Sequence, residues 1–563
     1  MTVSPQPRLG GQIIADQLQL LGATKVFCVP GESFLGMLDG LYEHRDQIQV
    51  VTCRHEGGAA NMAEAHGKLT GLPGVCAVTR GPGATNASNG VHTAFQDSTP
   101  MILLIGQVGL DMMEREAFQE IDYRRMFGQM AKWVAQIDDP ARIPEYLSRA
   151  WAVAQSGRPG PVVLALPEDV LSGSASVPDA RRMTIATPAP APDVMTRFAA
   201  LLAEATRPMV ILGGAGWDAE TAAMAQAFCE RFDLPVATSF RRQDYIDNAH
   251  PLYAGPVGIA PVPSLAKAIR EEADLIIALG PRLGEMTTQG YALVNSPIPQ
   301  MRFVHIHRGA EELGHVYAAD LAINAGAKAF LTAASALPDP DLTGREAGWA
   351  TRHHAAYRAF QTPTEVPGAV NMAHVIAHLS AEMPEDTIFT NGAGNYTVWL
   401  HRYHSHRRYR TQLAPTSGSM GYGVPAAIAA KLTHPDRAVV ALAGDGCFLM
   451  TAQELATAKQ FKAGVIFIVV NNGMYGTIRM HQERTFPGRV MATELENPDF
   501  VAYAKAFGIG GEIVTKTEDF PAALARAKSA EAGYLIEIVV DPEALTPAQT
   551  LSAARIQGQG GKA

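Results

Sequence analysis

The stretch that decides the fold of this chain is Val439-Val440-Ala441-Leu442-Ala443-Gly444-Asp445-Gly446, followed further along by Val465-Ile466-Phe467-Ile468-Val469-Val470-Asn471-Asn472. Both parts begin as short apolar runs rich in β-branched residues, which predict buried parallel strands. Between them, the segment from Thr451 to Lys459 has the composition of a helix. The order of strand, glycine-rich turn, helix and strand is that of a βαβ unit, which binds ligands at the carboxyl edge of its sheet.

The polar residues of this stretch suit a phosphate group and a metal ion. Gly444 and Gly446 let the backbone approach a diphosphate closely, and the helix start that follows supplies free N–H donors. Asp445 and Asn472 offer hard oxygens, which Mg²⁺ prefers. The alternative is an ordinary βαβ unit with a chance Gly-Asp-Gly turn and an Asn-Asn strand end. The prediction therefore depends on the spacing of 24 residues between Gly446 and Asn471.

Length and composition describe a large folded protein. A chain of 563 residues suggests about three or four domains, and 47% apolar against 18% charged residues argues against disorder. The net charge of −9, without a long basic run, argues against nucleic acid as a partner. No apolar run reaches the ~20 residues that a membrane span needs. Five scattered cysteines suit buried thiols in a reducing compartment, so we expect a cytoplasmic protein.

Strand patterns alternate with helix patterns along the chain, which predicts an α/β fold of doubly wound parallel sheets. The predicted domains are residues 1–170, 194–336 and 369–545. Residues 171–193 lose periodicity and fill with Ser, Ala and Pro, which predicts a stiff linker. We expect a second, irregular linker from Leu337 to Gly368 and a mobile tail from Asp541 to Ala563.

A basic, histidine-rich segment runs from His401 to Arg410. A metal or a nucleic acid could be proposed for it, but no Cys or further carboxylate pattern supports a zinc site. We interpret it as a solvated or interface loop.

The spacing from Gly444-Asp445-Gly446 to Asn471-Asn472 resembles the signature of thiamine diphosphate-dependent enzymes. The layout of nearly the whole chain is similar to the superfamily of decarboxylases and acetolactate (acetohydroxyacid) synthases. This resemblance implies a first domain that binds the aminopyrimidine, a last domain that binds the diphosphate, and a middle domain that is structural or holds a nucleotide. It also implies a homodimer or homotetramer, because the two binding domains usually come from different subunits.

The resemblance assigns roles to particular residues. Glu56, in Arg54-His55-Glu56-Gly57-Gly58, matches the catalytic glutamate that lies beside the pyrimidine. Its alternative role is that of a carboxylate favouring a helix N-terminus. Gln119 matches a polar residue that lines carboligase pockets, with a solvated Gln on a helix face as the alternative.

The resemblance also implies a metal and diphosphate site. Mg²⁺ would be bound by Asp445, the Asn472 side chain and the backbone carbonyl of Met474, with diphosphate and water completing its octahedron. Met420 matches the apolar wedge that bends the cofactor. The implied cofactor-binding residues are Asn395, Tyr396, Gly418, Met420, Gly444, Asp445, Gly446, Cys447, Asn472, Met474, Tyr475 and Gly476.

Substrate residues are where the chain departs most from the superfamily. Simple decarboxylases carry an acid after the Asn pair, and its absence before Arg479 favours carboligation. Synthases use an Arg and a Trp for the second 2-oxo acid, where this chain has Met286 and His481. Glu32 places an acid where relatives often have a small residue. FAD is slightly disfavoured, because His307 stands where synthases with FAD carry an acid.

We therefore predict a thiamine diphosphate- and Mg²⁺-dependent lyase or transferase, an acetolactate synthase-like carboligase that acts on a 2-oxo acid or a related small carbonyl compound. Three alternatives remain: a simple 2-oxo acid decarboxylase that releases aldehyde, a flavin-dependent enzyme like pyruvate oxidase, and a non-catalytic homologue that binds the cofactor.

Overall fold

The computed structural model describes residues 6–560, so the first five residues and the last three of the predicted tail lie outside it. The chain divides into two compact units. The first contains the residues up to Ala186 together with 428–435 and 451–463, and the second contains 187–427, 436–450 and the residues from Gly464 onward. The segment predicted as the helix of the opening βαβ stretch thus belongs to the first unit.

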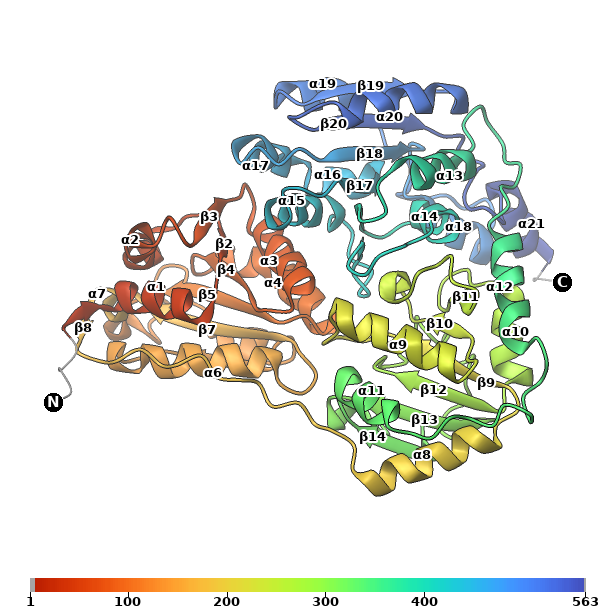
Figure 1. Ribbon diagram of the computed structural model, residues 1–563. Coiled ribbons are helices and arrows are strands. Elements are labelled where there is room, and N and C mark those ends of the chain that lie inside the picture. Colours follow the sequence, from red (N-terminus) through yellow and green to blue (C-terminus); the bar gives the residue numbers. More distant parts are fainter. Residues whose placement is uncertain (1–5, 561–563) are drawn as a thin grey trace. The chain divides into compact units, whose positions relative to one another are not determined.

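The first unit is built on a parallel six-stranded sheet in the order β3-β2-β4-β5-β7-β6. Its strands are β2 (Lys25–Cys28), β3 (Gln49–Thr52), β4 (Gly74–Val78), β5 (Met101–Gln107), β6 (Trp133–Gln136) and β7 (Pro161–Pro167). Its main helices are α1 (Gly10–Leu21), α2 (Leu35–Glu43), α3 (Glu56–Thr70), α4 (Pro82–Asp97) and α6 (Ile143–Gln155). Helices α1, α2 and α6 pack on one face of the sheet, and α3 and α4 pack together on the other (Figure 1). A short pair, β1 (Arg8–Leu9) with β8 (Ser174–Ala175), is antiparallel.

The second unit contains two further parallel sheets. The first has the order β11-β10-β9-β12-β13-β14. Its strands are β9 (Pro208–Leu212), β10 (Val236–Thr238), β11 (Tyr253–Pro256), β12 (Leu275–Leu279), β13 (Arg302–His307) and β14 (Leu321–Asn324). The helices around it are α8 (Pro192–Glu204), α9 (Ala219–Arg231), α10 (Pro263–Lys267), α11 (Ala327–Ser335) and α12 (Trp349–Phe360).

The other sheet of this unit has the order β16-β15-β17-β18-β20-β19. Its strands are β15 (Ile388–Asn391), β16 (Gln412–Leu413), β17 (Val439–Gly444), β18 (Ile466–Asn471), β19 (Gly510–Val514) and β20 (Tyr534–Val539). Helices in this part of the chain are α13 (Met372–Glu382), α14 (Tyr396–Tyr403), α15 (Gly423–Thr433), α16 (Asp445–Leu449), α17 (Leu455–Gln460), α18 (Gly476–Thr485), α19 (Phe500–Ala506), α20 (Phe520–Lys528) and α21 (Leu551–Gly560). Helices α13 and α20 cover one face, with Leu379 and Phe520 against β-branched strand residues (Figure 1).

These sheets confirm the predicted α/β class of three doubly wound parallel sheets. The first and third sheets have the same strand order when their strands are numbered along the chain. This agrees with the similar alternation of strand and helix patterns in the two sequence regions. In both sheets the next strand along the chain lies on one side and the following strand on the other: β3 and β4 flank β2, and β16 and β17 flank β15. A crevice at such a topological switch is where open α/β sheets bind ligands.

Two predictions about irregular segments are wrong. The supposed linker from Leu337 to Gly368 contains helix α12, whose Trp349 and Tyr357 are buried in the core of the β9–β14 sheet. Tyr357 meets Tyr253 edge-on at 4.8 Å between ring centroids. The supposed mobile tail contains helix α21. In both segments Gly, Pro and polar residues hid a few apolar side chains at helical spacing, which bury against distant parts of the chain.

No helix within residues 6–560 is long and apolar enough to cross a membrane.

Candidate active site

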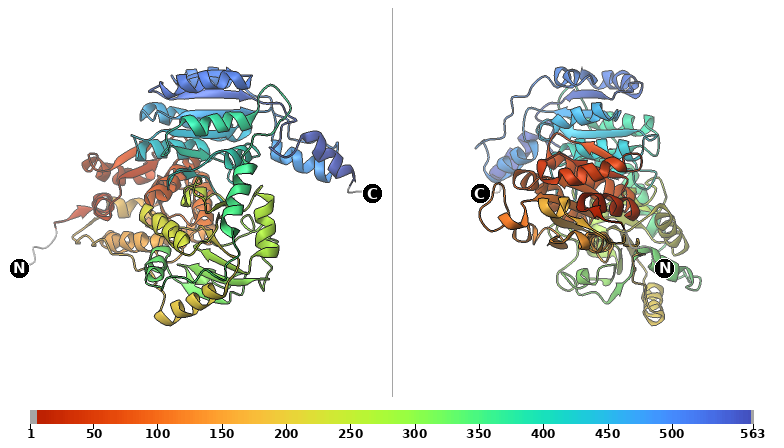
Figure 2. Two further views of the ribbon diagram at one scale, coloured as in Figure 1. Left: turned by 45° about the vertical axis from the view of Figure 1, so that its right-hand side comes forward. Right: turned by 90° about the vertical axis from the view of Figure 1, so that its left-hand side faces the viewer.

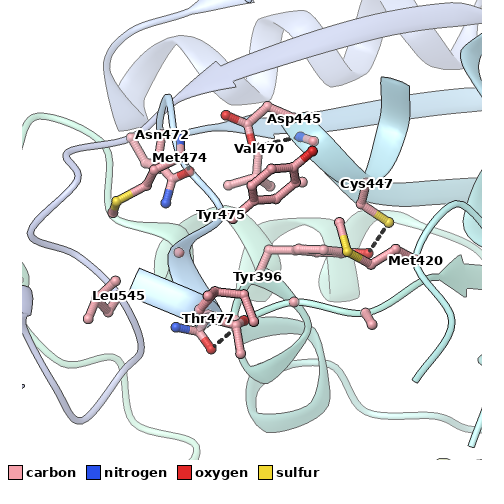
Figure 3. A pocket seen from close by; sticks show the side chains of 18 of the residues that line it. Tyr396, Met420, Asp445, Cys447, Val470, Asn472, Met474, Tyr475, Thr477 and Leu545 are labelled. Carbon is pink, nitrogen blue, oxygen red and sulfur yellow. Dashed lines mark hydrogen bonds between the residues drawn. The ribbon is translucent and has the colours of Figure 1, made fainter. Parts of the chain in front are cut away.

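A cavity of about 270 Å³ opens in the second unit at the switch between β15 and β17 (Figure 3). Most of its walls come from the segments that follow the carboxyl ends of β15, β16, β17, β18 and β20. Every residue that the resemblance implied for the cofactor lines it: Asn395, Tyr396, Gly418, Met420, Gly444, Asp445, Gly446, Cys447, Asn472, Met474, Tyr475 and Gly476. The ends of β15, β16, β17 and β18 therefore bring together cofactor residues that lie up to 81 positions apart, from Asn395 to Gly476.

Asp445 begins helix α16 and is 3% exposed. Its Oδ1 accepts a hydrogen bond from the Gly446 N–H at 2.9 Å, and its Oδ2 accepts one from Asn497 Nδ2 at 2.9 Å. Burial raises the pKa of the Asp445 carboxyl, while these donors act in the opposite direction. Asn497 was not predicted from the sequence, because it lies in a loop with no motif that marks it.

The two asparagines at the end of β18 have different surroundings. Asn472 lines the cavity, and its Oδ1 accepts from the Met474 N–H at 3.3 Å. Asn471 accepts from Asn497 Nδ2 at 3.0 Å, and its own Nδ2 donates to Glu537 Oε1 at 2.8 Å. Asn471 therefore ties the loop that carries Asn497 to β20, while Asn472 faces the cavity.

Figure 3 shows Asp445 and Asn472 toward one end of the cavity, with Met420 and Cys447 toward the other. The Asp445 carboxylate, the Asn472 amide and the Met474 carbonyl are hard oxygen donors of the kind that Mg²⁺ takes, with room beside them for further oxygens. A Cβ on Gly446 would stand 2.4 Å from Tyr475 Cε1, so only glycine lets this ring and the turn lie so close. The donors and the glycine turn thus fit a metal-bound diphosphate.

Tyr396 crosses the floor of the cavity and is 7% exposed. Its Oη accepts from the Gly392 N–H at 3.0 Å and lies 3.3 Å from Cys447 Sγ. Burial raises the pKa of this phenol well above its usual range. A Cβ on Gly444 would stand 3.0 Å from Tyr396 Cδ1, so the ring lies flat against the glycine turn.

Two cavity features escaped sequence analysis. Asn395 Oδ1 accepts from Thr477 Oγ1 at 2.9 Å, which fixes how that amide faces the cavity. Leu545, from the supposed tail, also lines the cavity.

Beyond Leu545, helix α21 packs beside α18 (Figure 2), and Arg555 pairs with Glu483 at 2.7 Å. Glu483 is buried, and its hydrogen bond from Arg555 is the main cause that lowers its pKa to about 2.

The predicted catalytic glutamate lies in the first unit. Glu56 is the first residue of α3, so the alternative role at a helix start is also present. Its Oε2 accepts from Asn86 Nδ2 at 2.9 Å, and Asn86 belongs to α4. His55 caps the helix, since its Nδ1 accepts from the Gly57 N–H at 3.0 Å. The carboxylate is therefore oriented by a residue 30 positions further along the chain.

Gln119 lies near the same edge of that sheet. It is half-buried in a turn with φ +65°, not on a helix face as its alternative assumed. A Cβ on Gly81 would stand 2.7 Å from Gln119 Cβ, and one on Gly83 would stand 3.6 Å from Glu56 Oε1. Gln119 therefore packs against Gly81 in the turn after β4, and Glu56 lies near Gly83, two residues further along.

The residues proposed to select substrate are dispersed. Ile478, in the segment after the Asn pair where the chain lacks the decarboxylase acid, lines the cavity and is 55% exposed. Met286 and His481 do not line the cavity within the described residues, and Glu32 is exposed in the first unit. His307 is buried at the end of β13, where its Nδ1 lies 3.0 Å from the Gly309 carbonyl.

The histidine-rich segment is not solvated. His401, His404 and His406 are all buried. The ring of His404 lies 4.1 Å from that of Phe389, and the His406 carbonyl accepts from the Asn248 N–H at 2.8 Å. The interface part of the interpretation is right, because the segment joins strand β15 to residues that follow β10.

Comparison with known proteins agrees with this geometry. Three family models match the chain: the thiamine pyrophosphate enzyme N-terminal TPP binding domain over residues 8–126, the central domain over 195–334, and the C-terminal TPP binding domain over 392–538. Fold and matches together define the class, an enzyme dependent on thiamine pyrophosphate, which is thiamine diphosphate.

Relatives narrow the class. The chain is 31% identical over 564 residues to the acetolactate synthase large subunit of Corynebacterium glutamicum, covering 96% of this chain and 88% of that protein. It is 30% identical to the probable acetolactate synthase large subunit of Methanocaldococcus jannaschii, covering 96% and 93%. It is 29% identical to the acetolactate synthase isozyme 2 large subunit of Escherichia coli (strain K12), covering 94% and 95%. The chain belongs to the acetolactate synthase-like family of thiamine diphosphate-dependent enzymes.

Proposed function

We propose that this enzyme is a thiamine diphosphate- and Mg²⁺-dependent carboligase that cleaves a 2-oxo acid and joins the remaining acyl unit to a carbonyl acceptor. One observation carries the proposal. Asp445 and Asn472, from adjacent strand ends, face one end of a cavity that the glycine turn at Gly444 and Gly446 also lines. That arrangement suits a diphosphate held through a hard divalent cation.

The residues have distinct roles in this proposal. Asp445, Asn472 and the Met474 carbonyl would hold Mg²⁺. The Cys447 N–H would face the diphosphate, while the Gly446 N–H donates to Asp445 Oδ1. When bound, thiamine diphosphate supplies the electron sink for carbon–carbon cleavage. Met420 would hold the cofactor in its bent form through apolar contact.

Glu56 would hold a proton at the pyrimidine ring. Its Oε2 is held by Asn86 at 2.9 Å, which leaves the other oxygen for the ring nitrogen. In line with the family resemblance, we propose a homodimer or homotetramer in which Glu56 serves the cofactor anchored by a second copy of the chain. Gln119 would then line the substrate side of the same site.

Carboligation is favoured over aldehyde release by the chemistry of the walls. Asp445 is the only carboxylate among the described residues that line the cavity, and it is assigned to the metal. Since Asp445 is assigned to the metal and Glu56 to the pyrimidine ring, no acid that lines the cavity is left to protonate the acyl unit, which favours its transfer to a carbonyl acceptor. The relatives named acetolactate synthase support a 2-oxo acid as donor.

We also propose domains over 1–170, 194–336 and 369–545, with α12 packed against the second and α21 against the third. We propose no tightly bound FAD and a cytoplasmic location. All five cysteines are buried and free of disulfide bonds, which suits a reducing compartment.

The test is to titrate the purified protein with thiamine diphosphate in Mg²⁺ by calorimetry, and then to incubate it with a panel of 2-oxo acids. Mass spectrometry of the products distinguishes acetohydroxy acid or acyloin from free aldehyde. Failure to bind the cofactor would refute the proposal, and aldehyde as the sole product would replace carboligation by simple decarboxylation. A yellow protein that consumes O₂ would indicate a flavin oxidase.

A further inference from the structure

Glu454 is a buried carboxylate with no place in the roles described so far. It is 0% exposed and belongs to the first unit, in the segment 451–463. Its Oε1 accepts from the His55 N–H at 2.9 Å and from the Arg54 N–H at 3.1 Å, and its Oε2 accepts from Thr457 Oγ1 at 2.6 Å. A charge this deeply buried is costly unless several donors surround it, as they do here.

The two backbone N–H groups that donate to Glu454 belong to the residues just before Glu56. His55 and Arg54 are the two residues that lead into α3, and their N–H groups have no acceptor within the helix itself. The His55 ring accepts from the Gly57 N–H, while the backbone N–H of His55 donates to Glu454, 399 positions away. A second contact, from Arg54 Nη2 to Gln460 Oε1 at 2.7 Å, ties the same turn to the same segment.

Gly58 shows that this contact leaves no spare space. A Cβ on Gly58 would stand 2.5 Å from Glu454 Oε1 and 2.8 Å from its carboxyl carbon. Only glycine therefore lets the carboxylate reach the turn. Glycine inside a helix destabilises it by about 0.5–1 kcal/mol relative to alanine. The contact with Glu454 therefore requires a residue at position 58 that is less favourable for the helix.

We propose that Glu454 is a positioning residue for Glu56: it fixes the backbone of Arg54 and His55, and through them the place from which the Glu56 carboxylate reaches the pyrimidine. This inference rests on the proposed function of Glu56. The segment that carries Glu454 begins six residues after Asp445. The chain thereby links the turn that holds the diphosphate to the turn that holds a catalytic carboxylate.

The test compares Glu454→Ala and Glu454→Gln with Glu64→Gln in the full-length protein. Glu64 is a matched control, because it is also 0% exposed, lies on α3 and accepts from Thr99 Oγ1 at 2.6 Å. Amide hydrogen exchange of the peptide spanning residues 50–58 is measured without cofactor. Calorimetry with thiamine diphosphate and Mg²⁺, turnover of pyruvate, and exchange of the cofactor's C2 proton by NMR follow.

For Glu454→Ala we expect faster amide exchange at Arg54 and His55 and about a 100-fold loss of turnover and of C2 proton exchange, since a small misplacement of a catalytic group costs about that much. The Kd for thiamine diphosphate should stay within threefold. Glu454→Gln keeps an acceptor and should recover most of the loss, which also covers the case in which the alanine variant does not fold. Glu64→Gln should leave amide exchange at 50–58 and turnover unchanged.

Unchanged amide exchange at Arg54 and His55 in Glu454→Ala would overturn the inference, as would an equal loss of turnover in Glu64→Gln. The proposed function fails separately, if the wild-type protein neither binds thiamine diphosphate nor exchanges its C2 proton. The amide exchange result still decides in that case whether Glu454 fixes this turn.

Discussion

Asn497→Ala removes a side chain that joins Asp445 to Asn471. In the structure its Nδ2 donates to Asp445 Oδ2 at 2.9 Å and to Asn471 Oδ1 at 3.0 Å. A hydrogen bond to a charged group contributes about 1.5–3 kcal/mol and one between neutral groups about 1 kcal/mol. The first of these bonds orients the proposed metal ligand, so its loss should appear mainly as weaker metal binding.

The expected magnitude follows from that bond. Removing a group that orients a metal ligand lowers metal affinity about 10- to 100-fold, which corresponds to about 1.4–2.7 kcal/mol. Asn497→Asp should be worse than Asn497→Ala, because it places a second negative charge 2.9 Å from the Asp445 carboxylate. Both variants should keep the fold, since Asn497 is only half-buried.

The assay is calorimetric titration of thiamine diphosphate at a series of Mg²⁺ concentrations, with the exposed neighbour Glu496 replaced by alanine as the control. We expect the Mg²⁺ concentration at half-saturation to rise at least tenfold for Asn497→Ala and to stay within twofold for Glu496→Ala. A variant that lacks Asn497 yet shows the wild-type Mg²⁺ dependence would refute the role given to this network.

Three further predictions concern other parts of the molecule. Glu56→Gln should lose at least about 100-fold in turnover, the usual contribution of a proton-transferring group, while the Kd for thiamine diphosphate by calorimetry stays within threefold; full activity would contradict the mechanism. Arg555→Met should release α21, because Glu483 is left buried without its main partner, and amide exchange at 551–560 should speed up while exchange in β18 does not. The pKa of His404 is lowered to about 3 by burial, below its ordinary value of 6.5. Protonation therefore favours the unfolded chain, so this histidine should reduce the free energy of unfolding by up to about 1.4 kcal/mol for each pH unit from 6.5 down toward 3. His404→Phe should flatten the pH dependence of the denaturation midpoint over that window, and an unchanged slope would show that His404 does not titrate there.

Part of the site was predictable because its signals are local. β-Branched runs predict β17 and β18, and a glycine turn after a parallel strand places Asp445 at a sheet edge. Strand order then brings Asn472 to the same edge without any long-range information beyond the βαβ rule. The other cofactor residues implied by resemblance follow the carboxyl ends of β15 and β16 in the same parallel sheet, which is why they all line one cavity.

Other parts had no local signal. Thr477 and Leu545 line the cavity, and Asn497 donates to the Asp445 carboxylate from a loop that folds back toward β17. Conversely, Met286 and His481 align with substrate residues of relatives, yet the described structure leaves both outside the cavity walls. A motif records which residue stands at a position, but not how far its loop reaches.

By itself, the sequence predicted the α/β class and the two strand ends that carry Asp445 and Asn472, because residue spacing within one βαβ unit leaves few alternatives. The role of Glu56 was predicted from the family resemblance alone. Only the tertiary structure decided what holds these residues. The hydrogen bonds from Asn497 to Asp445 and from the His55 N–H to Glu454 span 52 and 399 positions, and they form because buried N–H groups and carboxylates must find partners wherever the packed chain brings them.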